Sequence, residues 1–280
     1  MIDATEFKRD RGVLTVAALL IAATFGYHLI FAETAFMGLA AERLEGTRQL
    51  SFLRTVIGAC GLVGGLLAGW RFRLERYPRA VSNAMRACAG VAVLAIMAQT
   101  WELLLITAAL TGLSLGWLMV TLVAGLRACV GTPQLGLCIG LGVGLAHAFN
   151  LIPWLVTADP TIQTVVATVV IGLAAVVTPL MLPQEPSAAW LPDYQPGAVA
   201  AWMAVFLALG WIDSAAFAVL PFQPGLLAWA NVALSLGAAL LAGLVIDRGW
   251  FGRIALIAFA LLGSASLLMA ETSLYPTGAG

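Results

Sequence analysis

Long apolar runs alternate with short polar turns along most of the chain. Each run has about 20 residues, the length at which an α-helix crosses the roughly 30 Å hydrocarbon core of a membrane. The first run is too long for the core of a signal peptide, so we expect it to be a spanning helix. Division at charged residues and at Pro or Gly turns predicts nine such helices, over residues 13–36, 51–70, 80–98, 103–126, 135–156, 161–183, 199–220, 226–246 and 254–271.

A polar segment between the sixth and seventh predicted helices interrupts this pattern. Its sequence, PQEPSAAWLPDYQPG, contains four prolines and two acidic residues. Such a composition is typical of a linker. The pattern therefore divides the chain into a first six-helix bundle (1–182), a cytoplasmic linker (183–198) and a partial second bundle with helices seven to nine (199–280).

Composition agrees with helices that are immersed in lipid. Hydrophobic residues make up 61% of the chain and charged residues 10%, whereas a soluble domain carries about 25% charged residues. Because the chain cannot cover itself with polar surface in water, the sequence predicts an all-α integral membrane protein. The net charge is zero and no basic run is present, so we expect no nucleic-acid partner.

Two common motifs of nucleotide and metal chemistry are missing from the sequence. It has no P-loop and no HExxH motif, which argues against ATP hydrolysis and zinc-dependent proteolysis. The cysteines form no CxxC pair and lie in or beside apolar runs, where small core residues are more common than metal or redox sites. We therefore expect neither an enzyme nor a metal or cofactor site.

The distribution of positive charge predicts the orientation in the membrane. If the N-terminus is inside, eleven of the fourteen Lys and Arg residues fall on the inner side, in agreement with the positive-inside rule. Only Arg43, Arg48 and Arg54 fall outside. We expect a cytoplasmic N-terminus in a bacterial cytoplasmic (inner) membrane.

Short segments near the start of the chain recur near its end. The pairs are Gly26-Tyr27 with Gly210-Trp211, GGLLAG at 64–69 with AALLAG at 238–243, and MAQT at 97–100 with MAET at 269–272. Their order is the same and their offsets are similar, so helices one to three are predicted to recur as helices seven to nine. Parallel repeats of this kind occur in transporters. The alternative is that helices rich in Leu, Ala and Gly resemble one another without repetition.

The end of the eighth predicted helix carries a more specific pattern. It contains Gly243, Asp247 and Arg248, and the Gly252-Arg253 pair follows before helix nine. This arrangement resembles the loop signature of the major facilitator superfamily of transporters. In that family the signature lies on the inside, between helices two and three and again between helices eight and nine.

The first-half copy of the signature departs from the family pattern. Gly69 is present, but Arg73 stands where the Asp would fall and no Gly-Arg pair follows. A second resemblance lies in helix five, where Gly136, Gly140 and Gly144 have the spacing of the family's glycine motif, with Leu141 in place of its customary Pro. That motif is often found in antiporters, but close packing of helices is the simpler interpretation.

The resemblance also predicts how much of such a protein is present. Members of the family have twelve helices in two groups of six. The repeat can be followed through Thr272, the partner of Thr100, and counterparts of residues 103–183 are absent. This implies a truncated member, either a natural nine-helix form or a fragment.

Ionisable residues inside the predicted helices are candidates for function because charge is costly in lipid. Asp213 lies in the middle of helix seven, and the repeat aligns it with the neighbour of His28 in helix one. The resemblance implies that both helices line a central cavity, where the two side chains could face each other and carry a coupling proton. For His28, a hydrogen bond to a backbone carbonyl is an equally good interpretation.

Three further polar residues lie in the predicted helices. His147 and Asn150 are one turn apart on helix five and face the same way. Glu33 lies near the predicted outer end of helix one, where it can reach water or lipid headgroups. We keep all three as candidates for binding a substrate or a proton.

The predicted function is secondary active transport by alternating access, coupled to protons, with the lipid bilayer and a small solute as further partners. Tyr27, Trp117 and Trp211 could form an aromatic wall for the solute. Because charge within the helices is sparse, a neutral or hydrophobic solute is expected. The alternative is a non-transporting membrane scaffold or assembly factor, or a truncated, inactive fragment, which the missing first-half Asp and the missing last helices favour.

Overall fold

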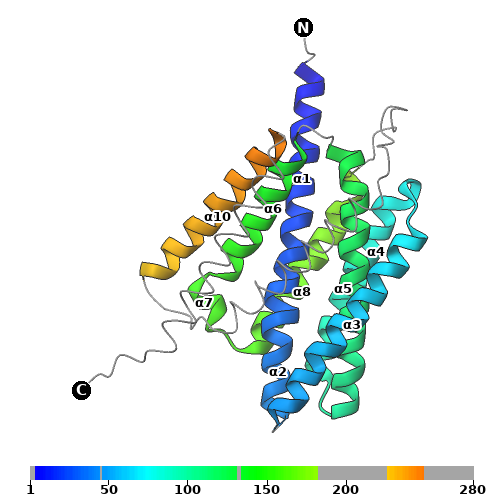
Figure 1. The fold of residues 1–280 in the computed structure, drawn as a ribbon, viewed down its shortest axis with the longest axis vertical. Helices are drawn as coiled ribbons and strands as arrows, with labels where there is room; N and C mark the ends of the chain where they lie inside the picture. Colours follow the sequence, from blue (N-terminus) through cyan, green and yellow to red (C-terminus); the bar gives the residue numbers. More distant parts are fainter. Residues whose placement is uncertain (1–3, 45, 131–133, 182–225, 249–280) are drawn as a thin grey trace. The chain divides into compact units, whose positions relative to one another are not determined.

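The computed structural model describes residues 4–44, 46–130, 134–181 and 226–248. The chain divides into two compact units, and every described residue except Arg248 belongs to the unit formed by Met1–Glu185 and Pro224–Asp247. All regular elements of this unit that the structure describes are helices (Figure 1). The predicted site residues Trp211, Asp213, Gly252 and Arg253 lie outside the described residues.

The first helix is continuous from Ala4 to Arg43. It consists of α1 (Ala4–Tyr27), a π-helical segment η1 (His28–Ala35) and α2 (Phe36–Arg43). The predicted end of this helix at residue 36 is wrong, because the apolar sequence after Glu33 and Thr34 continues the helix for two more turns. Glu33 therefore lies in the interior of the helix.

The remaining elements follow the predicted spans closely. They are α3 (Thr47–Arg71), η2 (Leu74–Arg76), α4 (Tyr77–Met97), α5 (Trp101–Val130), α6 (Leu135–Asn150), α7 (Pro153–Val156), α8 (Pro160–Val177), η3 (Thr178–Leu180) and α10 (Leu226–Asp247). The fifth predicted helix is divided, since it ends at Asn150 and a short helix begins at Pro153. At the start of α8, Asp159 Oδ1 accepts a hydrogen bond from the backbone N–H of Thr161 at 2.7 Å, as N-cap residues do.

Five helices of the described part are long and apolar enough to cross a membrane, namely Gly12–Arg43, Arg48–Arg71, Leu74–Met97, Trp101–Val130 and Pro160–Leu180. On α8, large apolar side chains at Val165, Val169, Leu173 and Val176 are exposed at helical spacing, as expected for a face in contact with lipid. These findings agree with the all-helical membrane class. The number of nine helices stays a prediction, because the seventh and ninth lie outside the described residues.

Buried polar contacts join the helices at both ends of the unit. The hydroxyl of Tyr77 on α4 donates to Leu122 O of α5 at 3.0 Å, and Ser82 of α4 donates to Ala175 O of α8 at 2.8 Å. Arg43, the last residue of α2, reaches the C-terminal end of α4. Its guanidinium donates to the carbonyl oxygens of Ala95, Ile96 and Ala98 at 2.7–3.0 Å. A cation at this position also interacts favourably with the helix dipole, so Arg43 fixes the end of the first helix against α4.

Glycines set the distance between α3 and α5. A Cβ atom on Gly112 would overlap Ile57 O, and one on Gly116 would overlap the backbone of Gly61. The two backbones approach too closely for any larger side chain. Small residues at four-residue spacing have this role in membrane helices, and the predicted packing role of Gly112 and Gly116 is confirmed.

Replacement of Gly116 by Ala should lower the melting temperature of the detergent-solubilised protein. The new methyl group meets backbone atoms of Gly61, and overpacking of this kind costs about 1–3 kcal/mol. Gly172→Ala is the matched control, because a Cβ atom on Gly172 of α8 meets nothing within 4 Å. Thermal unfolding monitored by circular dichroism measures both; equal melting temperatures would contradict the packing argument.

Candidate functional site

The first helix changes its hydrogen-bonding pattern in the middle of the span. The hydroxyl of Thr34 donates to Leu29 O at 2.8 Å, and the backbone N–H of Phe36 donates to Phe31 O, so both bonds connect residues five positions apart. Such π-helical segments are rare and are frequently found at functional sites. No feature of the residue pattern predicted this segment.

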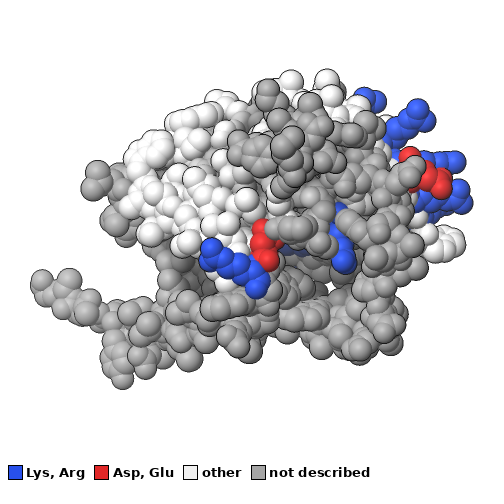
Figure 2. Space-filling view, turned by 90° about the horizontal axis from the view of Figure 1, so that it is seen from above, with Lys and Arg blue, Asp and Glu red and all other residues white. Residues whose placement is uncertain are grey.

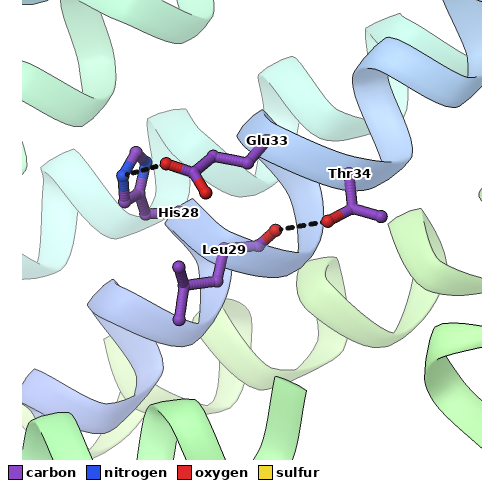
Figure 3. Close-up of polar contacts among 4 residues, drawn as sticks. All are labelled: His28, Leu29, Glu33 and Thr34. Carbon is purple, nitrogen blue, oxygen red and sulfur yellow. Dashed lines mark hydrogen bonds and ion pairs between the residues drawn. The ribbon is translucent and has the colours of Figure 1, made fainter. Parts of the chain in front are cut away.

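The wider turn brings His28 and Glu33 together. The Nε2 atom of His28 lies 3.0 Å from Oε1 of Glu33 (Figure 3). In an α-helix the side chains that meet are three or four positions apart, whereas the π-helical segment lets residues five apart meet. The two side chains are about one third and two fifths exposed, so the pair lies at a partly open surface of the helix bundle.

One atom of His28 remains available for a further interaction. Its Nδ1 atom is buried and has no hydrogen-bond partner in the part of the chain that the structure describes. A buried ring nitrogen without a partner is costly. The imidazole therefore has one nitrogen engaged with a carboxylate and the other buried without a hydrogen-bond partner among the described residues.

Two further basic groups surround the carboxylate of Glu33. Arg54 of α3 and His147 of α6 lie near enough to Glu33 to interact with it electrostatically, in addition to His28. The side chains come from three different helices, so the tertiary packing assembles the cluster. His147 was a predicted candidate, whereas Arg54, which lies within the second predicted span, was not named as a candidate because the sequence does not show that α3 places it beside Glu33.

A cavity of about 420 Å³ opens beside Glu33. It lies between the first helix and α3 and is lined by Glu33, Thr34, Met37, Gly38, Ala41, Leu50, Ser51 and Arg54. Its volume falls within the range of small-molecule sites, which combine mostly apolar walls with a few polar groups. The carboxylate of Glu33 and the guanidinium of Arg54 give it one negative and one positive group.

The aromatic wall predicted from the sequence is not assembled in the described part. Tyr27 is fully buried, and its hydroxyl donates to Cys88 O of α4 at 2.8 Å, so it holds two helices together. Trp117 lines a different cavity, together with Arg71 and Arg73. Asn150 lies half-buried at the end of α6, and no recorded contact connects it to Glu33.

The loop signature and the helix-five glycines meet in a second site. Both carboxylate oxygens of Asp247, at the end of α10, accept hydrogen bonds from the start of α6: Oδ1 from Gly136 N at 2.6 Å and Oδ2 from Leu137 N at 2.8 Å. The first N–H groups of a helix have no partner within the helix, and they carry partial positive charge. Asp247 therefore caps α6 from another helix.

Glycines let α6 and α10 lie close enough for this contact. A Cβ atom on Gly140 would overlap Ala239 O, and one on Gly243 would overlap Gly136 O. Gly144 packs against Leu236 of α10. The opposite face of α6 is equally tight, because a Cβ atom on Gly142 would lie 2.6 Å from Ile21 of α1.

The other signature residues have separate surroundings. Gly69 makes only ordinary contacts, since its Cβ atom would lie 3.9 Å from Val120. Arg73 lines the cavity that contains Trp117, and Arg248 is exposed.

A G-x-S-x-G spacing at residues 112–116 has the form of a serine-hydrolase nucleophile motif, in which the Ser stands on a sharp turn between a strand and a helix. Here it lies inside α5, and the Ser114 hydroxyl donates to Leu110 O at 2.7 Å. Its two glycines pack against α3. The spacing therefore serves helix packing.

No group of three or more His, Cys, Asp or Glu side chains in the described ranges could hold a metal ion.

In comparisons with known proteins, no family model, no curated protein and no solved structure matches the chain.

Replacement of Asp247 by Ala should loosen the start of α6. Loss of a capping carboxylate costs about 0.5–2 kcal/mol, and Cys138 lies in the freed first turn, buried in the native structure. We expect maleimide labelling of Cys138 to become several-fold faster, with labelling of buried Cys88 on α4 as the internal control. Peptide mapping by mass spectrometry measures both rates; an unchanged rate at Cys138 would show that the cap contributes little.

Proposed function

We propose that the protein is a secondary active transporter of the major facilitator type, which moves a small solute without net charge across a cytoplasmic membrane by alternating access. We further propose that the His28–Glu33 pair carries the coupling proton. The observation that carries this proposal is the carboxylate–imidazole pair on a π-helical segment inside a membrane-length helix, beside a cavity of solute size.

The pair has the chemistry of a proton carrier. An ionisable group inside a membrane-spanning helix is costly and is usually functional. In the proposed cycle Glu33 takes up and releases the proton beside His28; when the proton leaves, one negative charge remains on Glu33, near Arg54 and His147. A solute that enters the cavity beside Glu33 changes the surroundings of this charge. Binding of the solute and binding of the proton are therefore linked.

The cavity supports a solute without net charge. Its lining contains one carboxylate and one guanidinium among mostly small or apolar side chains. A zwitterion or a neutral polar molecule can interact favourably with both groups. A solute with a net charge is repelled by the group that has the same sign.

Alternating access requires helices that can separate and meet again, and the contact between α6 and α10 supports this. In this contact the helices meet through glycines, and Asp247 accepts two hydrogen bonds from backbone N–H groups of α6. These bonds can exchange with water without loss of a buried side-chain core. In the proposed architecture, α6 belongs to the first bundle and α10 to the second.

Proton flux in proteoliposomes tests the proposal. The purified chain is reconstituted with a pH-sensitive dye inside, and neutral amino acids and uncharged sugars are added outside. We expect one of these solutes to drive a change in internal pH. Glu33→Gln, which cannot ionise, should reduce the flux to that of empty vesicles, while the matched control Glu42→Gln, at the exposed end of the same helix, should leave it unchanged.

Two results would contradict the proposal separately. If neither class of solute is taken up or moves protons, the transport function fails and the scaffold or inactive fragment is favoured. If solute uptake occurs but Glu33→Gln retains the proton flux, the assignment of the coupling site fails.

A further inference from the structure

A second cavity, of about 380 Å³, lies at the end of the unit where α3 ends and α4 begins. Three arginines line it, Arg71, Arg73 and Arg76, together with Ala68, Trp70, Phe72, Ala80, Trp117 and Thr121. The lining comes from α3, α4, α5 and the connection between α3 and α4. Figure 2, which looks onto this end of the molecule, shows basic side chains gathered at one edge with acidic side chains among them. We refer to this hollow as the arginine cavity.

Among the described residues, no side chain neutralises the positive charge of the arginine cavity. None of its three guanidinium groups makes a hydrogen bond or an ion pair with another residue in the described ranges. The nearest acid in sequence, Glu75, is exposed and forms no salt bridge with them. Arg43 at the other end of the unit differs, because backbone carbonyls occupy its guanidinium.

Further arginines extend the positive region along α4. Arg76 and Arg79 line a neighbouring cavity of about 430 Å³, and Arg79 and Arg86 line the next, of about 340 Å³. Guanidinium groups bind phosphate oxygens through paired hydrogen bonds. A cavity with several such groups and no counter-ion among the described residues is therefore suited to a phosphate.

The location of the arginine cavity indicates where that phosphate comes from. On α3, Leu62, Leu66 and Trp70 are 66%, 75% and 81% exposed and occur at helical spacing, as expected for a face in contact with acyl chains. Trp residues are enriched at the level of lipid headgroups, and Trp70 is followed directly by Arg71. In a membrane, the cavity would thus lie where an apolar face ends and the layer of lipid headgroups begins.

We propose that the arginine cavity binds the phosphate group of an anionic phospholipid, whose acyl chains lie along Leu62 and Leu66 of α3. The site gives a role to Arg73, which stands where the loop signature has an acid. The second-half copy of the signature uses Asp247 to bind the positive end of a helix, and the first-half copy uses arginines to bind an anion. This site does not depend on the transport proposal.

Lipid binding to the purified chain tests the site by native mass spectrometry. Phosphatidylglycerol and phosphatidylcholine are titrated against the wild type, Arg73→Gln and the double variant Arg73→Gln/Arg76→Gln. Because each basic residue near an anionic surface contributes about 1 kcal/mol, we expect the double variant to bind phosphatidylglycerol roughly tenfold more weakly or worse, with little change for phosphatidylcholine. Arg48→Gln is the matched control, since Arg48 is an exposed arginine outside this cavity.

The outcomes separate the lipid from other sources of the same chemistry. Equal loss in Arg48→Gln, or no loss in the double variant, would overturn the proposal, because binding would then follow total charge or lie elsewhere. Inorganic phosphate is added in competition. If millimolar phosphate displaces phosphatidylglycerol completely, the site serves a soluble anion and the lipid assignment is wrong; if the lipid stays bound, the assignment stands. Equal melting temperatures of the variants confirm that the loss is not unfolding.

Discussion

The stabilisation of one carboxylate inside a membrane-length helix is the interaction on which the rest of this structure depends. A charged group in lipid is costly, and Glu33 is accompanied by His28 on its own helix, Arg54 on α3 and His147 on α6. These groups can converge only if the first helix continues past Glu33, if its hydrogen bonding shifts by one residue, and if α3 and α6 pack near it.

Glycine packing brings α6 close to the first helix and joins α3 to α5. Glycines join α3 to α5, α6 to α1 and α6 to α10, and in each pair a side chain would overlap the neighbouring helix. In lipid there is little hydrophobic force between helices, so close backbone contact and interhelical hydrogen bonds carry the association. Asp247 adds the polar part of this association by capping α6 from the end of α10. Close glycine contacts and the hydrogen bonds to Asp247 thus hold these helices together.

The sequence pattern predicted some of this arrangement and could not predict the rest. Apolar run length gives the spans, and four-residue spacing identifies Gly112, Gly116 and the glycines of α6 as packing residues. Asp247 was recognised by its motif, but its partner was not, because a periodic pattern indicates depth in the membrane and not which helix lies opposite. The His28–Glu33 pair was missed since it requires a π-helical segment that has no residue signature. The expected partner of His28, Asp213, lies outside the described residues.

The central claim is that Glu33 exchanges a proton while it lies within the span. Infrared difference spectroscopy of the reconstituted protein between two pH values detects the protonated carboxyl group directly. The account predicts a carboxyl band that appears as the pH falls, is absent in Glu33→Gln, and shifts in position when His28 is replaced by Gln. A spectrum identical for the wild type and Glu33→Gln at every pH would contradict the account.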